Sequence, residues 1–141
     1  MTCILKTERS LNPKFFVLIH GEYHPSNIFI DGTDLTVIDF DNDSYIFDAA
    51  KDLGYFIARL QSIKRKYNLL PLDVEAMEKC FLDQYTTKMS TEEEALERIG
   101  TYKARTYLQH LHFRYWIGRK RHKADLVDCE YWIKKAEQAI K

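Results

Sequence analysis

The sequence contains little proline, glycine and cysteine, and it has no long hydrophobic run. Its 141 residues include only three prolines and five glycines, which excludes a collagen-like or low-complexity chain. The three cysteines (Cys3, Cys80 and Cys129) are odd in number and far apart, so a disulfide framework is not expected. The apolar run in MTCILKTERS is too short for a signal peptide, and no segment has the length of a membrane span. We therefore expect a cytoplasmic protein with reduced thiols and no membrane partner.

The chain also lacks net charge, because 21 lysines and arginines balance 21 aspartates and glutamates. This balance, without a recognised binding motif, argues against a nucleic-acid partner. The basic run RKRHK at 119–123 could contact nucleic acid, but such runs are more often solvated helix ends. The charges are unevenly distributed: residues 1–60 contain 5 basic and 9 acidic side chains, whereas residues 61–141 contain 16 and 12. An acidic first part suits a site for cations or cation-bridged phosphates.

The hydrophobic pattern changes once along the chain. Short β-branched and aromatic runs predict strands near 15–19, 27–30 and 35–39. The turn sequence DGTD between the last two contains Gly32, which can adopt positive φ, and predicts a hairpin. After Asp48, apolar residues recur at three- and four-residue spacing, which is typical of helices.

The second part of the chain is therefore expected to be helical. Helices are predicted over four segments: 49–63, 74–85, 91–116 and 129–140. Asp48 is positioned to cap the first helix, Pro71 interrupts the pattern after it, and Thr91 with Glu94 forms a capping box before the third. With 45% hydrophobic residues, we expect one α+β, mostly helical domain that spans residues 1–141.

The stretch HGEYHPSNIFIDGTDLTVIDFDND, residues 20–43, concentrates polar side chains between short apolar runs. Glu22, Asn27 and Asp39 follow the order found in kinase-type phosphoryl-transfer enzymes, with an acidic residue, an asparagine and an aspartate after a hairpin. An acidic side chain can orient or accept the proton of an attacking hydroxyl, while asparagine and aspartate oxygens suit Mg²⁺. The pattern predicts ATP- and Mg²⁺-dependent phosphoryl transfer.

A histidine-bound zinc site is an alternative interpretation of the same stretch. His20 and His24 lie four residues apart, with Glu22 between them. The helical zinc motif, however, needs its glutamate directly after the first histidine, and Gly21 and Pro25 disfavour a helix here. A zinc hydrolase is therefore the weaker hypothesis, and it would require tightly bound zinc in the purified protein.

The strings HGEYHPSNIFID, VIDFDND and FDAAKDLGYFIARL together resemble the C-terminal lobe of the aminoglycoside phosphotransferase and choline kinase superfamily. The resemblance covers residues 15–60. It implies a protein-kinase-like C-terminal lobe with a small β-hairpin that carries the catalytic and metal loops. It also implies that Glu22 is the catalytic base and that Asn27 and Asp39 bind Mg²⁺ and, through it, ATP. The acceptor would be a hydroxyl group of a small molecule.

The same resemblance assigns supporting roles around these residues. Asp52, in the string KDL, corresponds to a buried aspartate that braces the catalytic loop in the family. His20 corresponds to a histidine that supports the loop from beneath. Asp41, two residues after Asp39, is expected to be a second carboxylate near the metal or the substrate.

Two departures from the family pattern qualify this prediction. Glu22 stands where the family has aspartate, which implies a slowed or altered phosphotransferase and leaves a non-catalytic pseudokinase or scaffold module as the alternative. In addition, only 19 residues precede His20, and they contain no glycine-rich phosphate loop. We therefore expect a C-terminal lobe without its N-terminal nucleotide-binding lobe, whose partner is either that missing lobe or a second copy of the chain.

Overall fold

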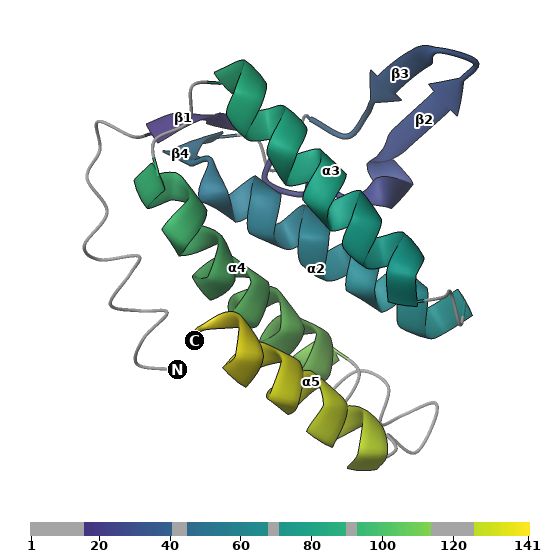
Figure 1. Ribbon diagram of the computed structural model, residues 1–141, viewed down its shortest axis with the longest axis vertical. Coiled ribbons are helices and arrows are strands. Elements are labelled where there is room, and N and C mark those ends of the chain that lie inside the picture. The colour runs from purple at the N-terminus through teal and green to yellow at the C-terminus, as the bar shows by residue number, and fades with distance from the viewer. Residues whose placement is uncertain (1–15, 41–44, 68–70, 90–92, 114–125) are drawn as a thin grey trace.

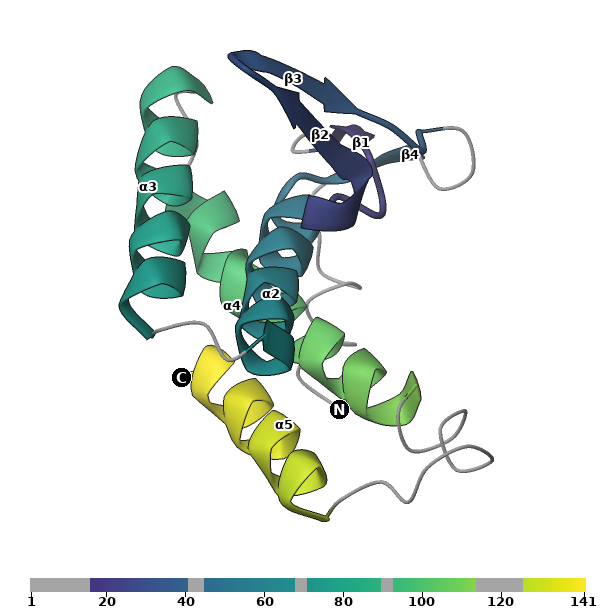
Figure 2. The same ribbon diagram turned by 90° about the vertical axis from the view of Figure 1, so that its right-hand side faces the viewer.

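The computed structural model describes residues 16–40, 45–67, 71–89, 93–113 and 126–141. The described residues are mostly helical, with two small antiparallel sheets, and so belong to the α+β class. The strands lie toward one end of the molecule, and most of the helical part extends away from them in two perpendicular views (Figures 1 and 2).

Each sheet consists of two short strands. Strand β1 (Phe16–Ile19) pairs with β4 (Tyr45–Asp48), and β2 (Ile28–Asp31) pairs with β3 (Asp34–Val37). The β2–β3 hairpin confirms the hairpin that the sequence predicts. Gly32 has a φ of 58° in its turn, a conformation that glycine adopts without steric cost.

Four long helices make up the body of the described part of the protein. They are α2 (Ala50–Tyr67), α3 (Pro71–Met89), α4 (Glu93–His112) and α5 (Leu126–Ala139). Helix α4 packs between α2 and α5, whereas α3 contacts α2 (Figure 1). None of the helices in the described part of the chain is both long and apolar enough to cross a bilayer.

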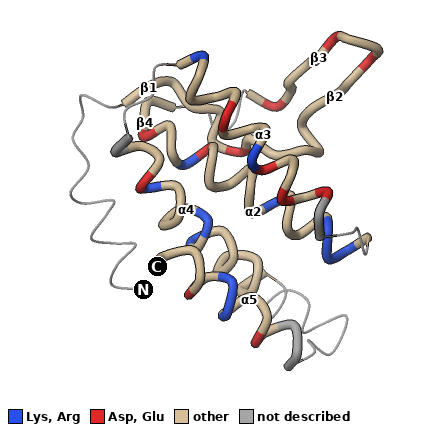
Figure 3. The backbone as a smooth tube through the Cα atoms, viewed as in Figure 1, with Lys and Arg blue, Asp and Glu red and all other residues tan. Residues whose placement is uncertain are grey.

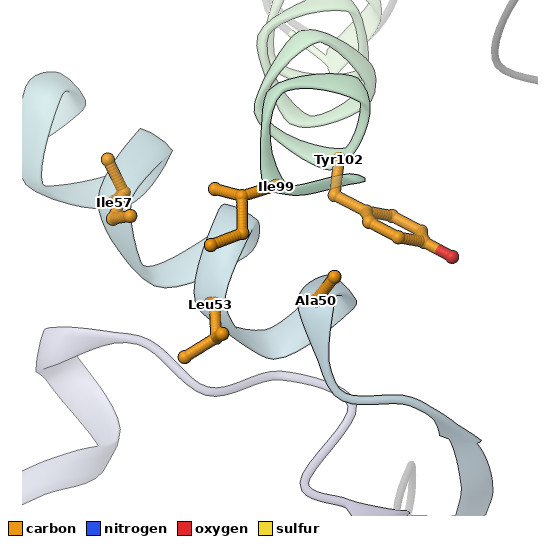
Figure 4. Close-up of a cluster of buried hydrophobic side chains, with 5 residues drawn as sticks. All are labelled: Ala50, Leu53, Ile57, Ile99 and Tyr102. Atoms are coloured by element: carbon orange, nitrogen blue, oxygen red, sulfur yellow. The ribbon is translucent and has the colours of Figure 1, made fainter. Parts of the chain in front are cut away.

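The core has two clusters, both of which involve α4. One joins α2 to α4 through five buried side chains: Ala50, Leu53, Ile57, Ile99 and Tyr102 (Figure 4). The other extends from α2 through α4 to α5: Ala58, Ala104, Tyr107, Trp132 and Ala136. Helix α2, which follows the strands directly, is thus fixed on the helical body and can position the loops above it.

Asp48 connects the sheet end to the helical body. Its carboxylate accepts a hydrogen bond of 3.1 Å from the backbone N–H of Ala50, and so it caps α2 as predicted. The Arg98 side chain on α4 also donates to both carboxylate oxygens, at 2.7 and 3.0 Å. Asp48 is only 1% exposed, and a bidentate pair of this kind compensates a buried carboxylate for its lost hydration.

The predicted elements agree with the structure except at their borders and at one strand. The prediction missed β4, because YIFD has no turn or alternation of its own and gains its stability by pairing with β1. Pro71, which was expected to interrupt the helical pattern, is the first residue of α3, where its missing N–H costs nothing. Two predicted features lie outside what the structure describes: the side chains of the Thr91–Glu94 capping box and the end of the third helix beyond residue 113.

Candidate functional site

The loop that follows β1 is held by the first turns of α2. The Asp52 carboxylate accepts hydrogen bonds from two consecutive backbone N–H groups, those of His20 at 2.6 Å and Gly21 at 2.9 Å. Gly21 has a φ of 87°, which aligns these N–H groups toward one side chain and is a conformation that other residues rarely adopt. Asp52 thereby fixes the backbone directly before Glu22.

His20 links the same loop to the β2–β3 hairpin. Its ring Nδ1 accepts a hydrogen bond of 3.3 Å from the N–H of Glu22, so Nε2 carries the proton and donates to the carbonyl oxygen of Ile38 at 2.8 Å. The ring is 5% exposed and lies 4.5 Å from the Phe40 ring, centroid to centroid. Because both ring nitrogens bind protein groups, this geometry does not favour the zinc alternative.

Asn27 joins the loop to the hairpin from the other side. It ends the short 3-10 helix η2 (Pro25–Asn27), and its carbonyl oxygen accepts a 3.0 Å hydrogen bond from Ile38, the residue before Asp39. The side-chain amide nitrogen of Asn27 donates to the carbonyl oxygen of Glu22 at 3.2 Å. This bond directs the amide oxygen, the atom that a hard cation prefers, away from the Glu22 backbone.

Asp39 has an unusual backbone conformation. Its φ of 70° is the only positive value for a non-glycine residue among the described residues. Such a conformation costs about 1 kcal/mol or more and occurs preferentially at functional sites. Its carboxylate is exposed, and the Asn27–Ile38 hydrogen bond brings it to the same end of the hairpin as Asn27.

Acidic residues are also present at the opposite end of the hairpin. Asp31 and Asp34 pair across its turn, and the two strands contain no lysine or arginine (Figure 3). In the described parts of the chain, no group of three or more His, Cys, Asp or Glu side chains could hold a metal ion. A site made by Asn27 and Asp39 fits Mg²⁺ nonetheless, because Mg²⁺ typically takes one or two carboxylates and completes its shell with water and substrate phosphates.

Aromatic side chains pack behind the loop. The Tyr23 ring stacks on Phe56 of α2, with 5.2 Å between centroids, and Phe56 contacts Phe81 of α3 at 4.6 Å. Burial, with the Asp52 carboxylate nearby, raises the pKa of Tyr23. Burial also lowers the pKa of His24, with further lowering by Arg59 and His20 and an opposing effect of Asp39. The Nδ1 atom of His24 accepts a hydrogen bond from the N–H of Ser26, and His24 thereby caps η2.

Glu22 lies on the other side of the loop, where its exposed side chain lines a cavity of about 150 Å³. Besides Gly21 and Glu22, the cavity is lined by Lys51 and Tyr55 of α2 and by Arg105 and Thr106 of α4. The structure therefore brings Glu22, Asn27 and Asp39 to one loop–hairpin unit braced by His20 and Asp52. The third supporting residue expected from the sequence, Asp41, lies outside the described residues.

Comparison with known proteins agrees with this geometry. Residues 4–72 match the phosphotransferase enzyme family. This segment contains β1, the loop, the hairpin, β4 and α2, and it confirms the resemblance to the aminoglycoside phosphotransferase and choline kinase superfamily. The match ends near the end of α2, so helices α3, α4 and α5 lie almost wholly beyond it. No curated protein and no solved structure matches the chain.

The sequence did not predict the cavity lining contributed by α4. Arg105 and Thr106 are far from Glu22 in the sequence, and nothing in the helical pattern distinguishes them from ordinary surface residues. Arg98, which neutralises the buried Asp48, was missed for the same reason. Such partners become visible only once α4 is packed against α2.

Proposed function

We propose that this protein is an ATP- and Mg²⁺-dependent phosphotransferase that acts on a hydroxyl group of a small molecule in the cytoplasm. The observation that carries the proposal is the loop–hairpin unit that contains Glu22, Asn27 and Asp39. Hydrogen bonds link Glu22 to His20 and Asn27, and they link Ile38, the residue before Asp39, to the same two residues. The family match over residues 4–72 supports the same reaction class.

Each residue of the unit has a role in the proposed reaction. Asn27 and Asp39 would hold Mg²⁺, which neutralises charge on the nucleotide phosphates. The Glu22 carboxylate orients the acceptor hydroxyl and takes its proton while the hydroxyl oxygen bonds to the γ-phosphorus of ATP. The bond between that phosphorus and the bridging oxygen breaks, and ADP leaves with the electron pair. Asp52 and His20 act indirectly, because they fix the backbone on either side of Glu22.

The acidic charge of the hairpin explains why nucleotide binding needs a metal ion in this proposal. Asp39 is exposed, and the hairpin carries acidic side chains but no basic ones. Without a bridging cation, this surface would repel the negatively charged phosphates of ATP. Nucleotide binding should therefore depend strongly on Mg²⁺.

The first prediction follows from this dependence and is tested by calorimetric titration of the purified chain with ATP, with and without Mg²⁺. We expect binding only with Mg²⁺ and its loss in Asp39→Asn. Asparagine tolerates positive φ nearly as well as aspartate, so this variant removes the charge without adding backbone strain. Asp34→Asn, at the hairpin turn, is the matched control and should bind like the wild type. Heat of binding that is equal with and without Mg²⁺, or that survives in Asp39→Asn, would contradict the proposal.

A further inference from the structure

The residues that line the cavity beside Glu22 include more cations than anions. Lys51 and Arg105 contribute two cations, and Glu22 contributes one carboxylate. Neutral hydrogen-bonding groups complete the lining, among them Thr106 and Gln109. A site that receives a polycationic acceptor would need the opposite balance, because like charges that face a ligand select against it.

We propose that this cavity binds the phosphoryl acceptor and selects a small hydroxylated molecule that bears a negative charge, such as a hydroxy acid. The inference rests on the proposed function, since it names the acceptor class of the same site. The acceptor places its hydroxyl at Glu22 and its anionic group at Lys51 and Arg105. A guanidinium presents a planar set of donors that matches a carboxylate or phosphate.

Contacts outside the cavity hold Lys51 in position. Its ammonium donates to the hydroxyl of Tyr45 on β4 and lies 4.6 Å from the centroid of that ring. An ammonium has three N–H donors, so the bond to Tyr45 leaves capacity for a ligand. The side chain is half-buried, which reduces the entropy that it loses when a ligand binds.

The size of the cavity also limits the acceptor. A cavity of about 150 Å³ holds a molecule about as large as benzene. Only part of an aminoglycoside, which is built from several linked rings, could occupy it. A small hydroxy acid fits within this volume.

A small organic cation is the main competing ligand. Tyr55 and Tyr102 also line the cavity, and aromatic rings bind quaternary ammonium groups such as that of choline. Lys51 and Arg105 would repel that group at short range. The two possibilities therefore predict opposite orders of affinity for ligands of similar size and different charge.

The experiment compares three such probes by calorimetric titration of the full chain without nucleotide: glycerate, glycerol and choline. We expect glycerate to bind more tightly than either of the others by about tenfold or more, the effect of one charge-assisted hydrogen bond. Arg105→Gln should abolish this preference, and Arg105→Lys should restore part of it. Lys134→Gln removes an exposed cation of α5 and is the matched control, which should leave the preference unchanged.

Three results would overturn the acceptor assignment: equal affinity for the three probes, tightest binding of choline, or no binding of any probe. The comparison of probes uses the wild-type chain, so it holds even if the Arg105 variants fold poorly. Its failure is distinguishable from that of the proposed function. If the chain prefers glycerate but shows no Mg²⁺-dependent ATP binding, the anion site stands and the phosphotransferase proposal is overturned. If the chain binds ATP but does not prefer glycerate, only the acceptor site is overturned.

Discussion

At the scale of single residues, the position of Glu22 decides whether the loop is catalytic. Its backbone is fixed from three sides, by Asp52 before it, by His20 at its N–H and by Asn27 at its carbonyl. The carboxylate, in contrast, reaches one methylene further than the aspartate of the family. Because these hydrogen bonds fix the backbone, only the conformation of the Glu22 side chain or the position of the acceptor can adjust to the extra length.

Replacing Glu22 with aspartate therefore tests catalysis directly. If base placement limits turnover, Glu22→Asp should accelerate ADP release from Mg·ATP in the presence of glycerate, by up to about a hundredfold for a correction near 1 Å. Glu22→Gln keeps the length but removes the charge, and it should be slower than the wild type. If neither the wild type nor Glu22→Asp releases ADP while both bind Mg·ATP and glycerate, the scaffold alternative is correct.

At the scale of secondary-structure elements, the close crossing of α2 and α4 determines the cavity. A Cβ atom at Gly54 would lie 2.7 Å from the Cβ of Tyr102 and 2.9 Å from the carbonyl oxygen of Ile99. Neither atom is the end of a flexible side chain, so a larger residue would have to push the helices apart. Lys51 and Arg105 lie on these two helices, and their separation depends on this contact.

In the variant Gly54→Ala, helix propensity and packing have opposite effects on the free energy of unfolding. Propensity favours alanine by about 1 kcal/mol, but overpacking a close contact costs about 1–3 kcal/mol. We expect a lower free energy of unfolding by denaturant titration. Thr87→Ala, at an exposed position of α3, is the control and should change stability by less than about 0.5 kcal/mol. A more stable Gly54→Ala variant would mean that the helices do not cross this closely.

The difference between local contacts and contacts with residues distant in the sequence explains which features the sequence alone could predict. The β2–β3 hairpin is encoded locally, by Gly32 and the flanking β-branched residues, and the site residues Glu22, Asn27 and Asp39 lie within one short stretch. Strand β4 and the cavity residue Arg105 depend on partners distant in the sequence. Their identification requires the tertiary structure, because no periodicity or turn signal marks a residue whose partner lies on another element.

At the scale of the whole molecule, the strands gather at one end and expose large apolar side chains there. Leu18 of β1 and Ile46 of β4 lie opposite each other and are 71% and 68% exposed, while Ile30 of β2 is 74% exposed. Both views show the strands toward one end of the molecule, with α3 at the same level and α5 extending away from them (Figures 1 and 2). Exposed apolar surface of this kind is typical of an interaction site.

We therefore predict that the isolated chain self-associates through this end, with a second copy covering the strands. Light scattering coupled to size-exclusion chromatography should show a mass that rises with concentration. The double variant Leu18→Thr and Ile46→Thr places threonine, a residue that strands favour, at both positions while it reduces the apolar surface, and it should stay monomeric. Ile133→Gln replaces an apolar residue of α5 that is 44% exposed and serves as the control, so it should associate like the wild type. A wild-type chain that is monomeric at high concentration would exclude this mode of association, because the exposed strand ends would then be stable in water without a partner.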